Sequence, residues 1–368
     1  MSLKVFLADI VTKSLSLDIL EDRMTELENL VETYGWIVIL KEYQRKDTPD
    51  PNTYIGSGKF KEIMDEMKES GANVLIIGNV LKPAQIYKLN ELLRPIKATA
   101  WDRVDLILKI FDKHADSAEA KLQIELASIK HMWPRIYGMG MELSRQWWWS
   151  KLARWAGETN TEIMRRHLRD KVLKIEEKLK VYEKMRKLHR ENRKRQWLKT
   201  VGIVWYTNAG KSSLLNTMTN KGVLAENKLF ATLGTYVGKI FIMKDPIMGT
   251  GKEILLNDTI GFIRDLPPKL IKAFTSTLED SIESDLLLHV IDAGDHFVQE
   301  RIDVVNHILD EIGATQPRVL VFNKIDTIDE ETCEKLKKKY ADQDILRVSA
   351  TSGEGIESIK QLLADRLV

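Results

Sequence analysis

The sequence predicts an α/β protein in three parts. These are an N-terminal α/β domain at residues 1–113, a long antiparallel helical hairpin at 114–198, and a C-terminal α/β domain with a mainly parallel sheet at 199–368. Short apolar runs alternate with helix-periodic stretches in the first and last parts, as in sheets covered by helices. The middle part is long, charged and helix-periodic. Short polar motifs follow the apolar runs of the last part, where strands would end.

The N-terminal part is predicted to alternate strands and helices. Apolar runs indicate the strands, and Leu20, Met24, Leu27 and Val31 form one apolar stripe of a helix. The expected strands cover residues 5–10, 36–40 and 73–78, and the expected helices cover residues 17–34, 60–69 and 83–93.

A polar segment at residues 49–59 separates the second strand from the second helix and contains Gly56-Ser57-Gly58-Lys59. These four residues are faintly similar to a phosphate-binding loop, but the full spacing is missing. A conformationally demanding loop that leads into a helix explains the segment better.

Two helical stretches, residues 115–132 and 158–197, fill the middle part. Two long helices joined by a loop pack as an antiparallel hairpin. The second stretch has an apolar seam at helical spacing, formed by Val172, Ile175, Leu179, Tyr182 and Met185.

The second helical stretch is also rich in basic residues, which leaves two interpretations open. Glutamates are interleaved with them, so the face could simply be solvated. Alternatively, it contacts the phosphate backbone of folded RNA. The basic residues are Arg165, Arg166, Arg169, Lys184, Arg186, Lys187, Arg190, Arg193, Lys194 and Arg195.

The segment between the two helical stretches contains Trp147, Trp148 and Trp149 in a row, followed by Trp155. Tandem indoles in a polar loop cannot all be core residues. They could stack on nucleic-acid bases, lie in a membrane interface, or be substitutions for other residues.

Composition is that of an ordinary globular protein: 43% hydrophobic and 30% charged residues over 368 residues, with a net charge of +2. That small charge gives no global attraction to nucleic acid, so any basic surface must be local. The single cysteine, Cys333, excludes an internal disulfide framework and fits a reducing compartment. Without a signal-peptide core or a membrane-length apolar run, we expect a cytoplasmic protein with no stable membrane insertion.

The last part is organised around one loop, Trp205-Tyr206-Thr207-Asn208-Ala209-Gly210-Lys211-Ser212, between an apolar run and a helix start. A strand, a tight loop ending in Gly-Lys-Ser and a helix form the phosphate-binding P-loop arrangement. The helix N-terminus would bind phosphate oxygens, Lys211 would reach the β- and γ-phosphates, and Ser212 would ligate Mg²⁺. The pattern has glycine where this chain has Trp205, because glycine permits backbone angles and close approaches that a Cβ forbids.

Two further motifs fit a triphosphate bound with a metal ion. Residues 229–233 form a candidate switch segment, in which Thr232, or failing that Thr235, would ligate Mg²⁺. Asp258-Thr259-Ile260-Gly261 follows a predicted strand. It would place a carboxylate near the metal and a glycine N–H at the γ-phosphate, so that hydrolysis releases the loop.

The last motifs predict a guanine base. Asn323-Lys324-Ile325-Asp326 follows a predicted strand at 319–322. Asp326 can accept the two hydrogen bonds that guanine donates from N1–H and its amine, which adenine cannot offer. Asn323 would fix the base, Lys324 would cover it, and residues 347–351 would contact its oxygen. Four motifs in this order predict GTP and GDP as ligands, and they exclude a P-loop small-molecule kinase.

Several of these stretches resemble the HflX family of translation-factor-class GTPases, and the similarity spans nearly the whole chain. The resemblance implies a C-terminal P-loop GTPase domain, Mg²⁺-dependent GTP hydrolysis, and association with the large ribosomal subunit and its RNA. Some members of the family separate or rescue stalled ribosomes. We expect a monomer without a DNA partner. The stretches are 54–59, 103–108, 144–146, 208–212, 229–233 and 258–267.

In that family, as here, Phe262 replaces the glutamine with which many GTPases orient water, so intrinsic hydrolysis should be slow and stimulated by a partner. The expected catalytic residues are Lys211, Thr232 and Gly261, and the expected Mg²⁺ ligands are Ser212 and Thr232. The expected nucleotide-binding residues are Trp205, Tyr206, Thr207, Asn208, Ala209, Gly210, Lys211, Ser212, Ser213, Phe230, Ala231, Thr232, Leu233, Gly234, Asp258, Thr259, Ile260, Gly261, Asn323, Lys324, Ile325, Asp326, Ser349, Ala350 and Thr351.

The chain departs from the family pattern where tryptophan stands in place of glycine: at Trp205, at residues 147–149 and near Trp155. Residues 234–236 also differ from the family's Asp-Pro-Thr. We hypothesise that these tryptophans were introduced or that the sequence was altered. Two function classes follow, a working GTPase switch on the ribosome and an RNA-binding protein with an impaired pocket. The Trp205 side chain should either distort the loop, which we favour, or swing out into solvent.

Overall fold

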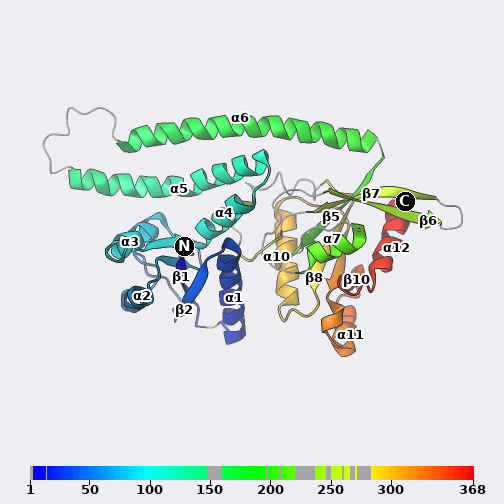
Figure 1. Cartoon of the computed structure of the whole chain (residues 1–368), viewed down its shortest axis with the longest axis horizontal. Coiled ribbons are helices and arrows are strands. Elements are labelled where there is room, and N and C mark those ends of the chain that lie inside the picture. Colours follow the sequence, from blue (N-terminus) through cyan, green and yellow to red (C-terminus); the bar gives the residue numbers. More distant parts are fainter. Residues whose placement is uncertain are drawn as a thin grey trace. The chain divides into compact units, whose positions relative to one another are not determined.

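The computed structural model describes residues 3–13, 15–147, 160–195, 197–207, 209–219, 237–245, 250–258, 261–265, 270–271 and 283–368. The chain divides into two compact units (Figure 1). The first comprises Met1–Lys113 with Lys121–Leu179, and the second comprises His114–Ala120 with Lys180–Val368. Both units are α/β, as predicted. Among the described residues, no helix has the length and apolar character that a membrane span requires.

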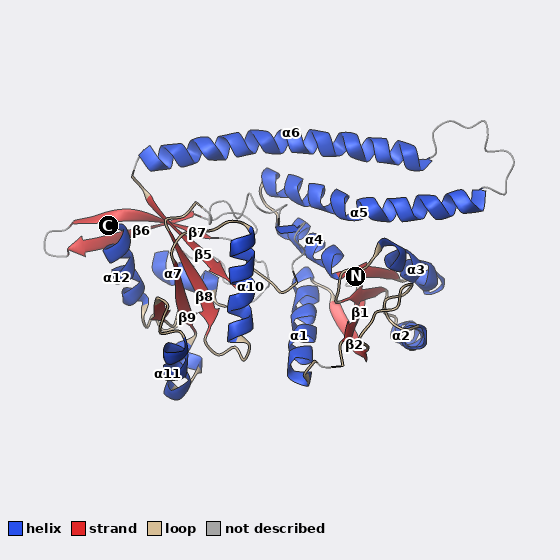
Figure 2. Ribbon diagram, turned by 180° about the vertical axis from the view of Figure 1, so that it is seen from behind, coloured by secondary structure: helices blue, strands red, loops and turns tan. Residues whose placement is uncertain are grey.

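The first unit is built on a four-stranded parallel sheet in the order β2-β1-β3-β4. On β1, Phe6 and Ala8 pack against α2 and α3, while Val5 and Leu7 on the opposite face are equally buried. Helices therefore cover both faces of this sheet (Figure 2). The strands are β1 (Lys4–Val11), β2 (Ile37–Arg45), β3 (Val74–Ile77) and β4 (Thr99–Asp102), and the helices are α1 (Leu17–Tyr34), α2 (Ser57–Ser70), α3 (Pro83–Leu93), the short 3₁₀ helix η1 (Arg94–Ile96) and α4 (Arg103–His114).

The expected helices at 17–34 and 83–93 have the predicted bounds. The strand expected at 36–40 is longer, because β2 continues to Arg45. The strand lies at the edge of the sheet, and its second half is mostly polar. The side chains of Ile37, Leu40 and Tyr43 are exposed. Residues 57–59, which we interpreted as a loop leading into a helix, form the first turn of α2.

The two long helices are α5 (Ala118–Trp147) and α6 (Asn160–Arg195), which run antiparallel as a hairpin (Figure 1). Ile175 of α6 is buried against Leu126 and Ile129 of α5, and Val172 and Leu179 pack beside them. The predicted seam is therefore correct over this stretch. It is wrong at Met185, which is half exposed because the buried face has turned away from that position.

The second unit contains a six-stranded sheet in the order β10-β9-β8-β5-β7-β6, in which only β6 is antiparallel to its neighbour. The topology reverses between β5 and β8, and ligands of such sheets bind at the carboxyl ends of the strands at this position. The strands are β5 (Lys199–Trp205), β6 (Val237–Asp245), β7 (Thr250–Asp258), β8 (Leu286–Asp292), β9 (Arg318–Asn323) and β10 (Ile345–Arg347).

Helices pack on both faces of this second sheet. One face forms a core with α7 and α12, and the other packs against α10 and α11. The helices are α7 (Lys211–Thr219), α10 (Val298–Glu311), the short 3₁₀ helix η2 (Ile325–Thr327), α11 (Glu330–Lys339) and α12 (Ile356–Leu367).

Candidate functional site

The predicted phosphate loop lies at the carboxyl end of β5 and leads into α7. Gly210 has φ +85°, a left-handed conformation that favours glycine, and Lys211 is the first residue of the helix. A Cβ at Gly210 would also collide with the side-chain amide of Asn323. Ser212 and Ser213 follow in the first turn of α7, partly exposed. The second glycine of the motif is therefore required by both the backbone angle and the space around it.

Asn323, the last residue of β9, connects three of the predicted segments. Its Nδ2 donates a hydrogen bond to the carbonyl of Ala209 over 2.9 Å. Its Oδ1 accepts one from the backbone N–H of Ala350 over 3.0 Å. The side chain is almost fully buried. The structure thus brings the phosphate loop, the Asn-Lys-x-Asp segment and the segment around Ser349 and Ala350 together.

Lys211 and Asp258 form a buried ion pair between the start of α7 and the end of β7. The two residues are 5% and 1% exposed, so both charges are shielded from water. Burial lowers the pKa of Lys211, and the Asp258 carboxylate acts against that shift. The lysine that was predicted to reach phosphates is therefore held by the carboxylate that was predicted to lie near the metal.

The Trp205 side chain lies inside this site. It is 6% exposed, so the alternative in which it swings into solvent is wrong. The Lys211 Nζ lies 3.9 Å from the centroid of the indole ring. A Cβ built on Gly261 would lie 2.7 Å from Trp205 Nε1, so this glycine also packs against the ring. The indole is thus in contact with both residues expected to bind the γ-phosphate.

Backbone hydrogen bonds join the head of the loop to the Asp-x-x-Gly segment. The Phe262 N–H donates to the Trp205 carbonyl, and the Thr207 N–H donates to the Phe262 carbonyl, each over 2.9 Å. Tyr206 adds a side-chain link, because its hydroxyl accepts a hydrogen bond from the Arg264 N–H over 2.9 Å. Sequence reasoning missed these contacts, since they depend on how two loops meet.

The Asn-Lys-x-Asp segment turns sharply after β9. Lys324 has φ +63°, and its Nζ lies 2.7 Å from Asp292 Oδ2 at the end of β8. The Ile325 N–H donates to the Val348 carbonyl over 3.3 Å, which ties the segment to the residues after β10. Asp326 is exposed in η2, whereas Ser349 is buried and Thr351 is exposed. Asp292 was not predicted, although an acidic residue after an apolar strand was a usable signal.

Several predicted residues lie outside the described part of the chain. They are Asn208, Phe230, Ala231, Thr232, Leu233, Gly234, Thr235, Thr259 and Ile260 in the second unit, and Trp148, Trp149 and Trp155 in the segment between α5 and α6. The expected metal ligand Thr232 is therefore not placed, and Trp147 is the last residue of α5.

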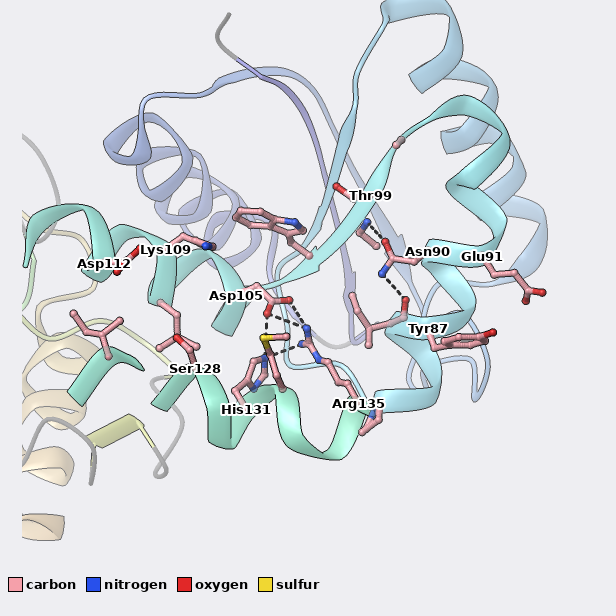
Figure 3. Close-up of a pocket in the computed structure, with 18 of the residues that line it drawn as sticks. Tyr87, Asn90, Glu91, Thr99, Asp105, Lys109, Asp112, Ser128, His131 and Arg135 are labelled. Atoms are coloured by element: carbon pink, nitrogen blue, oxygen red, sulfur yellow. Dashed lines mark hydrogen bonds and ion pairs between the residues drawn. The ribbon is translucent and has the colours of Figure 1, made fainter. Parts of the chain in front are cut away.

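A separate cavity of about 1150 Å³ lies in the first unit, lined by residues of α3, β4, α4 and α5 (Figure 3). Arg135, one of its lining residues, bridges two carboxylates, with Nη2 2.8 Å from Asp102 and Nη1 2.8 Å from Asp105. Burial acts to raise the pKa of Asp105, but His131 and Arg135 hold it at about 2. Asp102, Asp105 and His131 could together ligate a metal ion, but Arg135 already supplies the positive charge there. This cavity could not be predicted from the sequence, because its walls come from several separate segments.

Comparison with known proteins agrees with this arrangement. Three family descriptions match the chain: GTP-binding GTPase N-terminal at residues 21–112, GTP-binding GTPase Middle Region at 114–193, and 50S ribosome-binding GTPase at 200–324. The chain is 42% identical to GTPase HflX of Caldanaerobacter subterraneus over 84% of this chain and 70% of that protein. It is 38% identical to GTPase HflX of Escherichia coli over 94% of this chain and 79% of that protein.

Solved structures agree as well. The chain resembles a crystal structure of the complex of SsGBP and GDP, with a TM-score of 0.55 and 27% identity, over 99% of this chain and 98% of that one. A GTP-binding protein from Sulfolobus solfataricus in complex with GDP has a TM-score of 0.50 and 27% identity, over the whole of both chains. Both solved structures hold GDP.

Proposed function

The chain belongs to the HflX family of GTPases, and from this premise we propose that it binds GTP and GDP with Mg²⁺, hydrolyses GTP and acts on the large ribosomal subunit. The observation that supports the nucleotide part best is the position of Asn323. Its amide hydrogen-bonds to the phosphate loop at Ala209 and to Ala350. One side chain thus connects the segment that would hold the phosphates with the segments that would hold the base.

Guanine would be recognised by the segment that follows β9. Asp326 is exposed at the surface of η2, where its carboxylate can accept from the guanine N1–H and amine. The Lys324 stem would cover the base, as its ammonium group is already anchored by Asp292. Competition between GTP and ATP for the purified protein tests this directly. Equal competition by ATP would end the proposal, because a site built for hydrogen bonds rejects an analogue that lacks them.

Mg²⁺ would be held by Ser212 and Thr232. Ser212 follows Lys211 in the first turn of α7, which is where a P-loop hydroxyl ligates the metal. The buried Asp258 carboxylate at the end of β7 adds negative charge at this position. A bound Mg²⁺ would neutralise phosphate charge, while the backbone N–H groups at the start of α7 would orient the phosphate oxygens.

The proposed partner is the large ribosomal subunit, contacted through ribosomal RNA. The matched description of a 50S ribosome-binding GTPase supports this partner, and so does the excess of basic residues along α6. Arg186 is not part of the proposed surface, because it pairs with Glu119. A ribosomal partner implies action in the cytoplasm. We further propose that the chain acts as a monomer with three domains, divided at residues 113 and 198. Separation or rescue of stalled ribosomes is the activity we propose for this association.

A second candidate function keeps the RNA partner but not the full nucleotide chemistry. In this version the chain is a ribosome- or RNA-binding protein of GTPase fold whose pocket is impaired by Trp205. The contact of the buried indole with both Lys211 and Gly261 favours this version. The affinity of the purified chain for GDP, compared with that of its Trp205→Gly variant, separates the two. A variant that binds GDP at least about tenfold more tightly supports the impaired pocket, and equal affinities support the working GTPase.

A further inference from the structure

We infer that this chain recognises guanine compounds by their nucleoside half alone, so that guanosine, GMP, GDP and GTP bind about equally well. The inference rests on the guanine-binding function proposed above, in its second version in which Trp205 impairs the pocket, and specifies which ligands the site takes. It assigns to Trp205 the role of setting that specificity. Four features of the site, each independent of the identity of the base, support it.

The first feature is the position of the indole. In a P-loop site the γ-phosphate is bound by the loop lysine and by the N–H of the Asp-x-x-Gly glycine. Here the Lys211 Nζ lies 3.9 Å from the indole centroid. The edge of the same ring lies so near Gly261 that a Cβ on that glycine would be 2.7 Å from Trp205 Nε1. The indole therefore packs against both of these phosphate ligands.

The second feature is the charge of Lys211, which is already neutralised. Asp258 pairs with its ammonium group, and both side chains are almost fully buried. The face of an indole also attracts a cation. A phosphate would have to displace the ring and compete with the carboxylate before it could reach the lysine.

The third feature is the backbone around the indole. The loop head and the Asp-x-x-Gly segment are joined by two hydrogen bonds of 2.9 Å, between Trp205 and Phe262 and between Thr207 and Phe262. Ala209, further along the loop, is held by Asn323. The loop is thus fixed at both ends around the buried ring, which cannot leave without breaking packing in the core of the second unit.

The fourth feature is the separation of the base segment from the indole. Asp326 lies after β9, and β8 lies between β9 and β5, the strand that carries Trp205. Asn323 keeps both of its hydrogen bonds while the indole is in place. The groups that would bind guanine therefore stay available when the phosphate half is filled.

The experiment is a series of titration-calorimetry measurements on the full chain with guanosine, GMP, GDP and GTP, each in the presence of Mg²⁺. Adenosine and ATP serve as base controls. The same series is run on Trp205→Gly and on Trp205→Ala, which empty the space to different extents. Trp197→Gly is the matched control: it is the same substitution at a residue that is 80% exposed and has φ +54°, a backbone angle that suits glycine.

We expect the four guanine compounds to bind the parent chain and Trp197→Gly within about threefold of one another. In Trp205→Gly, GDP should bind at least roughly a hundredfold more tightly than guanosine, because two charge-assisted hydrogen bonds are worth about that much. Trp205→Ala should fall between the two. Circular dichroism checks that each variant is folded.

Three results would overturn the inference. A parent chain that binds GTP far more tightly than guanosine would show that the indole yields to phosphates, and the proposed GTPase function would stand. Failure of the parent to bind guanosine, while Trp205→Gly binds it, would show that the base segment is not available. If neither chain prefers guanine to adenine compounds, the proposed function fails, and this inference fails with it.

Discussion

Trp205 and Lys211 pack against each other in the phosphate loop, with the lysine nitrogen 3.9 Å from the centroid of the indole ring. A cation above a buried indole face is stabilised by roughly 2 kcal/mol or more, and Asp258 adds an ion pair on the same nitrogen. The lysine on which phosphate binding depends thus has two partners within the chain. Ligand binding at this site is a competition with those partners.

Asp326→Asn should change the base preference from guanine to xanthine. The amide donates a hydrogen bond where the carboxylate accepts one, so it matches the oxygen that xanthine has in place of the guanine amine. We expect the preference for guanine to fall by at least roughly tenfold, measured as competition between guanosine and xanthosine compounds. Asp342→Asn, at another exposed residue of the same unit, is the control and should keep the parent preference. An unchanged preference in Asp326→Asn would contradict the assignment.

Reversing the charge at the C-terminal end of α6 should weaken RNA binding and its salt dependence together. Each phosphate contact contributes nearly one unit to the slope of log affinity against log salt concentration. With Arg190, Arg193, Lys194 and Arg195 changed to glutamate, we expect the slope for ribosomal RNA to fall by up to about 4. The control reverses four charges on α11, at Lys335, Lys337, Lys338 and Lys339. Similar binding by both variants would leave α6 as a solvated face.

His289 should make the protein less stable in acid. It lies on β8, fully buried, and neither ring nitrogen has a hydrogen-bond partner in the described part of the chain. Burial, with a smaller effect from Arg318, lowers its pKa from 6.5 to about 3. The neutral ring is therefore favoured in the folded state. Its stabilising contribution is complete above pH 6.5 and is lost as the pH falls from 6.5 toward 3.

His289→Leu should remove this loss. Between pH 8 and pH 5 the parent should lose about 2 kcal/mol of unfolding free energy that the variant keeps, as measured by urea denaturation. His307→Leu, at an exposed position on α10, should behave like the parent. If the unfolding free energies of the parent and of His289→Leu depend on pH in the same way, the protonated ring must find a hydrogen-bond acceptor in the folded state.

Asp9 should destabilise the first unit at neutral pH. It lies on β1 at 8% exposure, and its Oδ1 accepts hydrogen bonds from the Ile10 N–H and the Tyr54 hydroxyl. Burial raises its pKa from 3.8 to about 6. The protonated form is thus favoured in the folded state. The stabilising contribution is complete below pH 3.8 and is lost as the pH rises through about 6.

Asp9→Asn keeps an oxygen for both hydrogen bonds and carries no charge. It should unfold with about 3 kcal/mol more free energy than the parent at pH 7, and with the same free energy below pH 4. Asp65→Asn on the exposed face of α2 is the control and should have no such effect. A less stable Asp9→Asn at pH 7 would mean that the positive charges of Arg23 and Arg103 require the carboxylate.

Local signals explain why parts of the fold could be predicted from the sequence. Helix α1 has the predicted bounds because Ser16 caps its N-terminus and Gly35 ends it in a left-handed conformation. The phosphate-loop, Asp-x-x-Gly and Asn-Lys-x-Asp motifs were found because each lies at the end of a buried strand. By contrast, the second half of β2 was missed, because an edge strand needs no continuous apolar run.

The inward position of Trp205 could not be predicted, because it depends on space between two loops that are distant in sequence. That tryptophan stands where the family has glycine, however, could be inferred from the sequence, and the backbone conformation points to one more such position. Trp197 has φ +54° and is 80% exposed. A bulky residue is uncommon in this conformation, which glycine adopts readily. The hypothesis that tryptophan stands at glycine positions in this chain therefore extends to residue 197.

The two hydrogen bonds of Asn323 also set an order in time. Ala209 leaves the ribosome long before Asn323 does, and Ala350 leaves later still. Because a chain is made from its N-terminus and folds in that order, the phosphate loop is synthesised well before the amide that braces it. The nucleotide site can only be completed when nearly the whole polypeptide has emerged. A truncated nascent chain ending before β9 would therefore hold an unbraced loop, and ligand binding could not assist its folding until most of the chain has been made.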